Sequence, residues 1–173
     1  MALPPSKRKK ASEYVLDESA LDLKKHMERL LESVVSVYES HGVPLPPRQY
    51  WQMGTPPEDC AQVVVSLLQI YLGAPGDQAA DIQPCNAPIT AVVNIHITRD
   101  YPVGEKGRPN TVDDIKDAAE WSAIDSWILM KAIKDFDKGE YDMPGLGAIA
   151  TIASRPAAGG LQTTVLNLST AVM

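Results

Sequence analysis

Alternating apolar and polar residues mark the stretch Ile89 to Pro102 as the centre of the predicted fold. Up to Thr98 its odd positions are apolar and its even positions are polar except for Val92, with Ile89, Ala91, Val93, Ile95 and Ile97 against Thr90, Asn94, His96 and Thr98. Side chains alternate across a strand, so the pattern predicts a β-strand with one face on a core and the other in solvent. Pro102 lacks a backbone N–H and is expected to end the strand.

A different spacing, with apolar residues at steps of three and four, predicts an amphipathic helix near the start of the chain. Asp17 is the expected N-cap, and the helix should run to about His41. Gly42 and Pro44 then end it, because glycine tolerates the left-handed conformation and proline cannot continue a helix. The predicted core stripe consists of Ala20, Leu23, Met27, Leu30, Leu31, Val34 and Tyr38.

A second helix is predicted from the N-cap Thr111 to about Phe136. Asp113, Asp114 and Asp117 stand near its N-terminus, where the helix dipole favours negative charge. Its predicted core stripe is Ile115, Ala119, Ala123, Trp127, Met130 and Ile133, and Trp121 and Ile128 fall outside that stripe.

Four other stretches have the character of strands. Residues 48–54 predict a short strand with aromatic side chains on both of its faces. The apolar run 61–72 fits a buried helix or a buried strand, and its three consecutive valines and flanking turns favour the strand. Residues 146–154 and 161–169 are separated by turn residues and predict a β-hairpin.

The predicted order of elements is therefore α-β-β-β-α-β-β. It indicates an α+β fold with an antiparallel or mixed sheet of about five strands and two amphipathic helices packed on one face. Residues 1–13 are expected to form a flexible basic arm, and residues 14–173 a single domain. A chain of 173 residues can bury about 70% of its unfolded surface.

Two segments fall outside this scheme. The arm contains Pro4-Pro5 and the run Lys7-Arg8-Lys9-Lys10; it is either a solvated tail or an arm that contacts an acidic neighbour or a DNA backbone. Residues 73–88 are expected to form a long loop, and loops of this length are usually functional or disordered. We interpret this loop as an element that orders against a partner through Ile82, with a tolerated surface insertion as the alternative.

Charge and composition narrow the class of protein. The formal net charge of −6 argues against a general nucleic-acid binder, which would present a basic face. No run approaches the ~18 apolar residues of a transmembrane helix, so no membrane association and an origin in the cytoplasm are expected. Cys60 and Cys85 are expected to be thiols that do not hold the fold together through a disulfide.

No catalytic constellation, metal site or cofactor site is predicted. Cys60 could act as a nucleophile only with one of the histidines as its base, and His26, His41 and His96 are all expected to be ordinary surface residues. The acidic cluster at the start of the second helix is explained by capping more simply than by Mg²⁺. The expectation is a protein that is not an enzyme.

Several local features taken together resemble a known group of proteins. They are the leading helix, Arg48-Gln-Tyr-Trp51, the segment Pro56 to Gln62, Cys85, Arg99-Asp-Tyr-Pro102, the Trp-bearing second helix and the C-terminal hairpin. Over roughly residues 15 to 170 this order resembles the neck proteins of long-tailed bacteriophages of actinobacterial hosts, most of all the tail terminators.

The resemblance implies a structural virion protein that assembles in the host cytoplasm. Tail terminators are small α+β subunits that form a hexameric ring on the head-proximal end of the tail tube. The ring ends tube polymerisation and joins the tail to the head connector, and genomic DNA passes through its lumen. The implied partners are copies of the chain itself, the major tail tube protein and a head-side stopper or connector protein. The candidate interface residues are Tyr50, Trp51, Ile82 and Trp121.

Two alternatives remain open at this point. One is another neck protein, a head-to-tail adaptor or stopper, although stoppers are typically smaller and mostly β. The other is a small cytosolic α+β enzyme or ligand-binding domain, which a monomer with a deep polar pocket would favour.

Overall fold

The computed structural model describes residues 18–76, 88–102, 110–140, 149–158 and 160–171. Seven elements follow one another in the predicted order: α1 (Glu18–Ser40), β1 (Arg48–Met53), β2 (Gln62–Leu72), β3 (Ile89–Asp100), α2 (Val112–Glu140), β4 (Ile149–Ala158) and β5 (Leu161–Ala171). The uncertainty between helix and strand in the apolar run 61–72 is thus resolved as the long strand β2.

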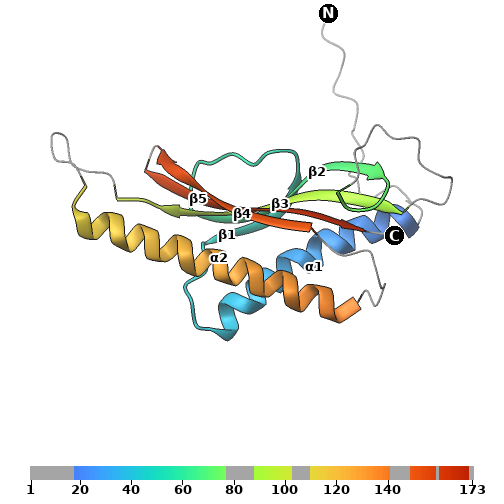
Figure 1. Cartoon of the computed structure of the whole chain (residues 1–173), viewed down its shortest axis with the longest axis horizontal. Coiled ribbons are helices and arrows are strands. Elements are labelled where there is room, and N and C mark those ends of the chain that lie inside the picture. Colours follow the sequence, from blue (N-terminus) through green and yellow to red (C-terminus); the bar gives the residue numbers. More distant parts are fainter. Residues whose placement is uncertain (1–17, 77–87, 103–109, 141–148, 159, 172–173) are drawn as a thin grey trace, which may run out of the picture.

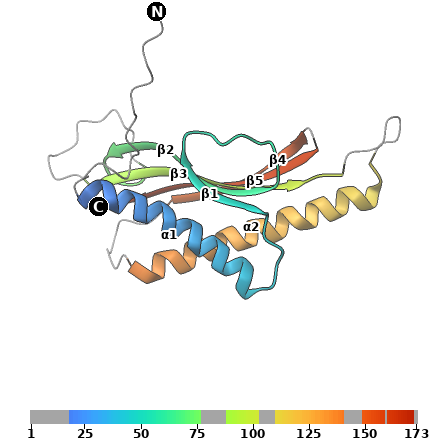
Figure 2. The same ribbon diagram turned by 180° about the vertical axis from the view of Figure 1, so that it is seen from behind.

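The elements form two layers, a five-stranded sheet and a pair of helices beneath one of its faces (Figures 1 and 2). The strand order is β1-β2-β3-β5-β4. β1 runs parallel to β2, and all other neighbouring strands are antiparallel. The sheet is therefore mixed, and the predicted α+β class with both helices on one face is confirmed.

The core lies between the sheet and the helices. The alternation along β3 sets it, since Ala91, Val93, Ile95 and Ile97 are all fully buried on the helix side. Val63, Val65 and Leu67 of β2 continue this face on one side of β3, and Leu166 and Leu168 of β5 continue it on the other. From below, α1 contributes the predicted stripe from Leu23 onward, with Met27, Leu30, Val34 and Tyr38 fully buried.

The helix ends are formed by the residues that the sequence marks. Gly42 has a φ of 63°, and its N–H donates to the carbonyl of Glu39 (3.1 Å). At the start of α2, Thr111 Oγ1 accepts from the N–H of Asp114 (3.1 Å), while Asp114 Oδ2 accepts from the N–H of Thr111 (2.9 Å). These reciprocal bonds form a capping box. A hydrogen bond from the Thr111 hydroxyl to Asp114 Oδ2 (2.7 Å), and after it the bond from the Thr111 N–H, lower the pKa of Asp114.

The C-terminal hairpin differs from the prediction in its boundaries. Arg155 and the residues after it were expected to form the turn, but β4 continues to Ala158. Arg155 pairs with Thr163, and a register shift between Arg155 and Ala158 absorbs the proline between them. The proline is tolerated because β4 is an edge strand of the sheet. Residues 146–148 lie outside the described part of the chain.

The predicted core stripe of α2 is wrong. Ile115, Trp127 and Met130 are 52%, 44% and 50% exposed, and Ala119 and Ala123 are exposed with them. Of that set, Ile133 alone packs against the core. The buried side of α2 instead carries Ala118, Asp125, Ile128, Leu129 and Ala132, with Trp121 half-buried beside them. Both sides of α2 carry apolar residues. The acidic Asp125 lies at the centre of the buried side, so the sequence pattern did not identify that side as the one facing the core.

The expected solvent face of β3 is also largely covered. Its polar side chains point away from the helices, yet Thr90, His96 and Thr98 are at most 1% exposed. The loop 54–61 between the parallel strands β1 and β2 crosses this outer face (Figure 1). It is attached there by Glu58, whose carboxylate accepts from Arg155 of β4 (2.8 Å). The face of β3 that is polar in sequence is therefore partly buried under the loop 54–61.

A search of the described helices for an apolar stretch long enough to cross a membrane finds none.

Candidate functional site

A cleft of about 550 Å³ opens at one end of the molecule. Five parts of the chain line it: the connector between α1 and β1, the end of the loop 54–61, the end of β3 with the two residues after it, the first half of α2 and the start of β5. The side chains that shape it are Leu45, Pro46, Pro47, Arg99, Asp100, Tyr101, Pro102, Asp117, Trp121, Asp125 and Gln162.

A buried ion pair forms the floor of this cleft. Arg99 at the end of β3 donates two hydrogen bonds of 2.8 Å to the two carboxylate oxygens of Asp125 on α2. The Tyr38 hydroxyl of α1 donates to the same carboxylate (2.6 Å). Asp125 is 3% exposed in its side chain and Arg99 16%. The pair therefore ties the end of the central strand to both helices, and the charge of each member is compensated where it is buried.

Two further contacts fix the guanidinium of Arg99. It lies over the ring of Trp121, with its central carbon 4.3 Å from the ring centroid, and it donates to the carbonyl of Pro44 (3.2 Å). Burial, and after it the neighbouring Asp125, raise the pKa of Tyr38 far above its ordinary value. Tyr38 thus remains a hydrogen-bond donor to Asp125 at every physiological pH.

The rim of the cleft is acidic. The carboxylates of Asp100 and Asp117 are exposed, and among the described residues neither forms a salt bridge. The one cation of the floor, Arg99, is already neutralised by Asp125. Beside these carboxylates stand the apolar surfaces of Tyr101, Trp121 and the prolines of the connector. The cleft therefore offers aromatic and proline surfaces next to carboxylates that form no salt bridge with a described residue.

Six of the exposed apolar residues of α2 form a second candidate surface, here called the outer stripe. It consists of Val112, Ile115, Ala119, Ala123, Trp127 and Met130, at steps of three and four along the helix. His41, at the end of α1, packs edge-to-face on Trp127 with ring centroids 4.8 Å apart. Large apolar residues gathered on one side of a helix, rather than scattered, are typical of an interaction surface.

A third surface lies at the C-terminal end of β2. β1 pairs with β2 only as far as Leu67, so within the described residues no strand pairs with residues 68–72 on that side. Leu68, Ile70 and Leu72 are 42%, 45% and 56% exposed, and Met53 at the end of β1 is 66% exposed. The result is an open sheet edge with apolar side chains, which invites pairing with another chain.

The three candidate interface residues that the structure describes are not brought together. Tyr50 and Trp51 lie on opposite faces of β1. Tyr50 donates to Gln62 Oε1 (3.0 Å) on the outer face, and Trp51 packs against the core. Trp121 stands in the cleft, and Ile82 lies outside the described residues. The outer stripe was missed as a surface because its residues were assigned to the core.

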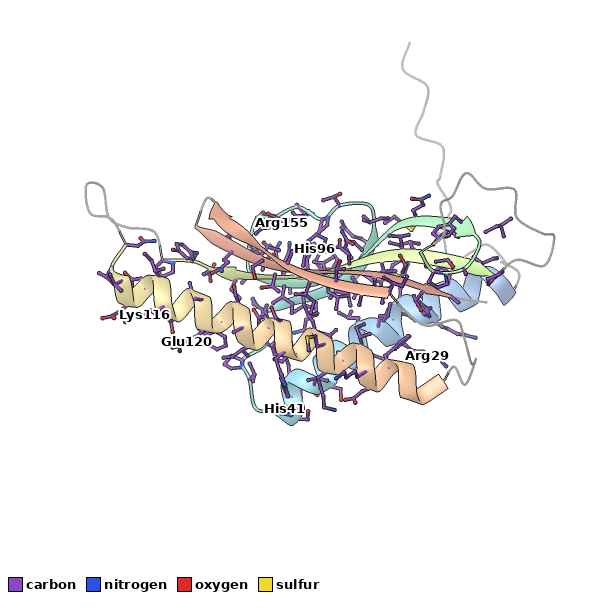
Figure 3. All side chains as sticks on the ribbon, in the orientation of Figure 1. Arg29, His41, His96, Lys116, Glu120 and Arg155 are labelled. Carbon is purple, nitrogen blue, oxygen red and sulfur yellow. The ribbon has the colours of Figure 1, made fainter. Side chains whose placement is uncertain are left out.

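Two of the histidines are buried, contrary to the surface positions expected for all three. His26 on α1 is 2% exposed and packs edge-to-face on Phe136, with ring centroids 5.3 Å apart. His96 is 1% exposed, and neither of its ring nitrogens has a hydrogen-bond partner among the described residues. His96 and Arg155 both lie on the side of the sheet away from the helices (Figure 3). His41 alone is exposed.

Burial lowers the pKa of both histidines to about 4; the charge of Arg29 adds to the effect at His26 and that of Arg155 at His96. In the unfolded chain the pKa is about 6.5. As the pH falls from 6.5 to 4 the unfolded chain therefore takes up protons that the folded protein does not. Each histidine should lower the free energy of unfolding by roughly 1 kcal/mol per pH unit in that window. Above pH 6.5 their contribution to stability should be complete.

Urea unfolding of the wild type and of His96→Gln between pH 4 and pH 7 measures this effect. The variant should show a weaker pH dependence than the wild type, and the same replacement at the exposed His41 serves as the matched control. An identical pH dependence in wild type and His96→Gln would contradict the assignment.

Cys60 is a free, half-buried thiol next to Gln62, and Cys85 lies outside the described residues, so the absence of a structural disulfide stays a prediction. Within the described part of the chain, no three His, Cys, Asp or Glu side chains come together in a way that could hold a metal ion.

A scan against protein-family models gives no match for this chain, and neither does a search of curated proteins.

Proposed function

We propose that this protein is a structural ring-forming subunit of a phage neck, with the role of a tail terminator. The observation that carries the proposal is the pair of separate apolar surfaces, the outer stripe of α2 and the open end of β2. The α+β fold with two helices on one face is the fold expected from the resemblance to tail terminators, and it supports the same proposal.

The two surfaces favour a ring over a two-fold dimer. They lie in different layers of the molecule, one on the helices and one on the sheet. A two-fold contact that uses one surface on both copies leaves the other surface in solvent. A head-to-tail contact that places one surface against the other buries both, and such contacts form rings when the rotation closes.

In this role the ring caps the head-proximal end of the tail tube, ends tube polymerisation and presents a surface to the head connector. DNA passes through its lumen, and the net charge of −6 disfavours adhesion of DNA to the subunit. The major tail tube protein and a head-side stopper or connector are the proposed partners.

Electron microscopy of tails assembled with and without the protein tests the proposal. Tails made with it should have a uniform length and carry an extra ring at one end, whereas tails made without it should vary in length and fail to join heads. Particles with only two-fold symmetry, and none on tail ends, would overturn the proposal.

The cleft favours one alternative, a ligand-binding domain that acts as a monomer. Size-exclusion chromatography with light scattering separates the two functions. A mass of about 18.8 kDa at all concentrations would favour the ligand-binding domain, and a mass several times larger would favour the ring.

A further inference from the structure

We propose that the cleft holds the N-terminal arm of a neighbouring copy, through residues 3–10. The sequence of that segment is Leu-Pro-Pro-Ser-Lys-Arg-Lys-Lys. The inference rests on the proposed assembly only in that the arm comes from another copy, and its test does not require a ring.

The apolar surfaces of the cleft suit the Pro-Pro part of the arm. Proline-rich segments adopt an extended polyproline II conformation with little loss of entropy, and they dock in grooves lined by aromatic side chains. Trp121 and Tyr101 supply the aromatic surfaces, and Pro46 and Pro47 of the connector complete the wall. Arg99 over the ring of Trp121 helps to hold that ring in place.

The charge of the cleft suits the basic part of the arm. Asp100 and Asp117 are exposed on the rim, and no described cation pairs with them. Lys7-Arg8-Lys9-Lys10 places four cations in a row, and elsewhere in the sequence no more than two are consecutive. In a chain with a net charge of −6, this run is the segment with the strongest attraction to the rim.

The geometry favours an arm from another copy. The end of α1 is next to the cleft, because Tyr38 and Pro44 both contact Arg99. The arm joins α1 at its other end, at Glu18, and Figure 1 shows that end on the side of the molecule opposite the start of α2. The 23 residues of α1 separate the two ends by roughly 33 Å at about 1.5 Å per residue.

An arm would have to be stretched to reach its own cleft. Lys7 to Lys10 precede Glu18 by 11 to 8 residues, which span at most roughly 40 to 29 Å when fully extended. The basic run could therefore reach its own cleft only when the chain between it and Glu18 is nearly fully extended. A copy placed head-to-tail brings the start of its α1 toward the cleft of its neighbour, so the arm of that copy needs no such extension.

The test uses the full-length chain with Lys7, Arg8, Lys9 and Lys10 replaced by serine, so that its own arm no longer competes. The probe is a fluorescently labelled peptide of residues 1–14, and its anisotropy is measured during titration. The peptide should bind, and Asp100→Asn with Asp117→Asn should weaken its binding at least tenfold. Both replaced side chains are exposed, so the variant should fold. Glu120→Gln, an exposed carboxylate of α2 that does not line the cleft (Figure 3), is the matched control.

A charge exchange gives a second measurement. The acceptor is again the full-length chain with serine in place of Lys7, Arg8, Lys9 and Lys10. A peptide with glutamate in place of its four cations should bind this acceptor only when Asp100→Lys and Asp117→Lys are also introduced into it. Equal binding of the native peptide to the acceptor and to its Asp100→Asn/Asp117→Asn variant, or no binding at all, would overturn the proposal. A wild-type monomer that excludes the peptide would show that the arm occupies its own cleft and would overturn the contact between copies.

The result is separable from that for the proposed function. Binding of the peptide by a protein that never appears on tail ends would keep this inference and reject the neck role. A protein that acts as a tail terminator but whose cleft does not bind the peptide would keep the neck role and reject this inference. The segment 103–109, which carries Lys106 and Arg108, flanks the cleft in sequence. Replacing these two cations could change the stability of the wild type, and also the effect of Asp117→Asn on that stability. If it does so while replacing the cations of the arm does not, the segment 103–109 is the occupant of the cleft and the proposal is wrong.

Discussion

Replacing Asp125 by alanine is expected to lower the free energy of unfolding by about 3–5 kcal/mol, because it leaves a buried charge without its partner. Arg99 would lose both of its 2.8 Å hydrogen bonds to a carboxylate. Tyr38 would lose the acceptor of its hydroxyl group at the same time. Since this one carboxylate joins β3 to both helices, the loss should appear as a large shift in the midpoint of urea unfolding.

A matched control separates the buried pair from a general effect of removing charge. Asp117→Ala removes an exposed carboxylate from the same helix and should change stability by less than about 0.5 kcal/mol. The double replacement Arg99→Met with Asp125→Leu should be closer to the wild type than Asp125→Ala is, because it removes both charges. If Asp125→Ala proves as stable as Asp117→Ala, the ion pair does not have the structural role assigned to it.

Introducing a charge into the outer stripe is expected to abolish assembly while the subunit stays folded. Trp127→Glu and Met130→Glu each place a carboxylate in a surface that the proposed contact removes from water. An unpaired charge that must be desolvated costs several kcal/mol, which corresponds to a loss of affinity of at least a hundredfold. Because Trp127 is 44% and Met130 50% exposed in the single chain, the fold should tolerate both replacements.

Light scattering and thermal unfolding, measured on the same samples, check this prediction. Ser36→Glu adds the same charge at an exposed position of α1 and should leave the oligomer intact. A variant that remains fully assembled would show that the outer stripe is not the contact between subunits. A variant that unfolds would show instead that the stripe stabilises the single chain.

The elements of this fold were predictable because most of them carry one unambiguous pattern. The alternation along β3 and the stripe of α1 from Met27 to Tyr38 each match a single secondary structure. Gly42 and Thr111 mark helix ends by backbone and side-chain chemistry that acts within one turn. Such local signals need no knowledge of the rest of the molecule.

The cleft and the outer stripe were not predictable in this way, since each depends on contacts between distant residues. From the sequence alone, Asp125 is expected to face solvent. It is buried because it pairs with Arg99, which is 26 positions away in the sequence. Once Asp125 is assigned to the wrong side of α2, the helix appears to bury Trp127 and Met130. His96 was misplaced for a similar reason, because nothing in the alternation along β3 reveals that the loop 54–61 crosses its polar face.

The strand order has a consequence for how the chain folds during synthesis. β5 lies between β3 and β4, yet it leaves the ribosome after every other described element. Until it arrives, β4 has no neighbour in the sheet, and β3 exposes the hydrogen-bonding edge that β5 later occupies. Unpaired edges of this kind promote aggregation in nascent chains. A chain cut before Leu161 would keep both edges open permanently, so β5 must be synthesised before the sheet can close.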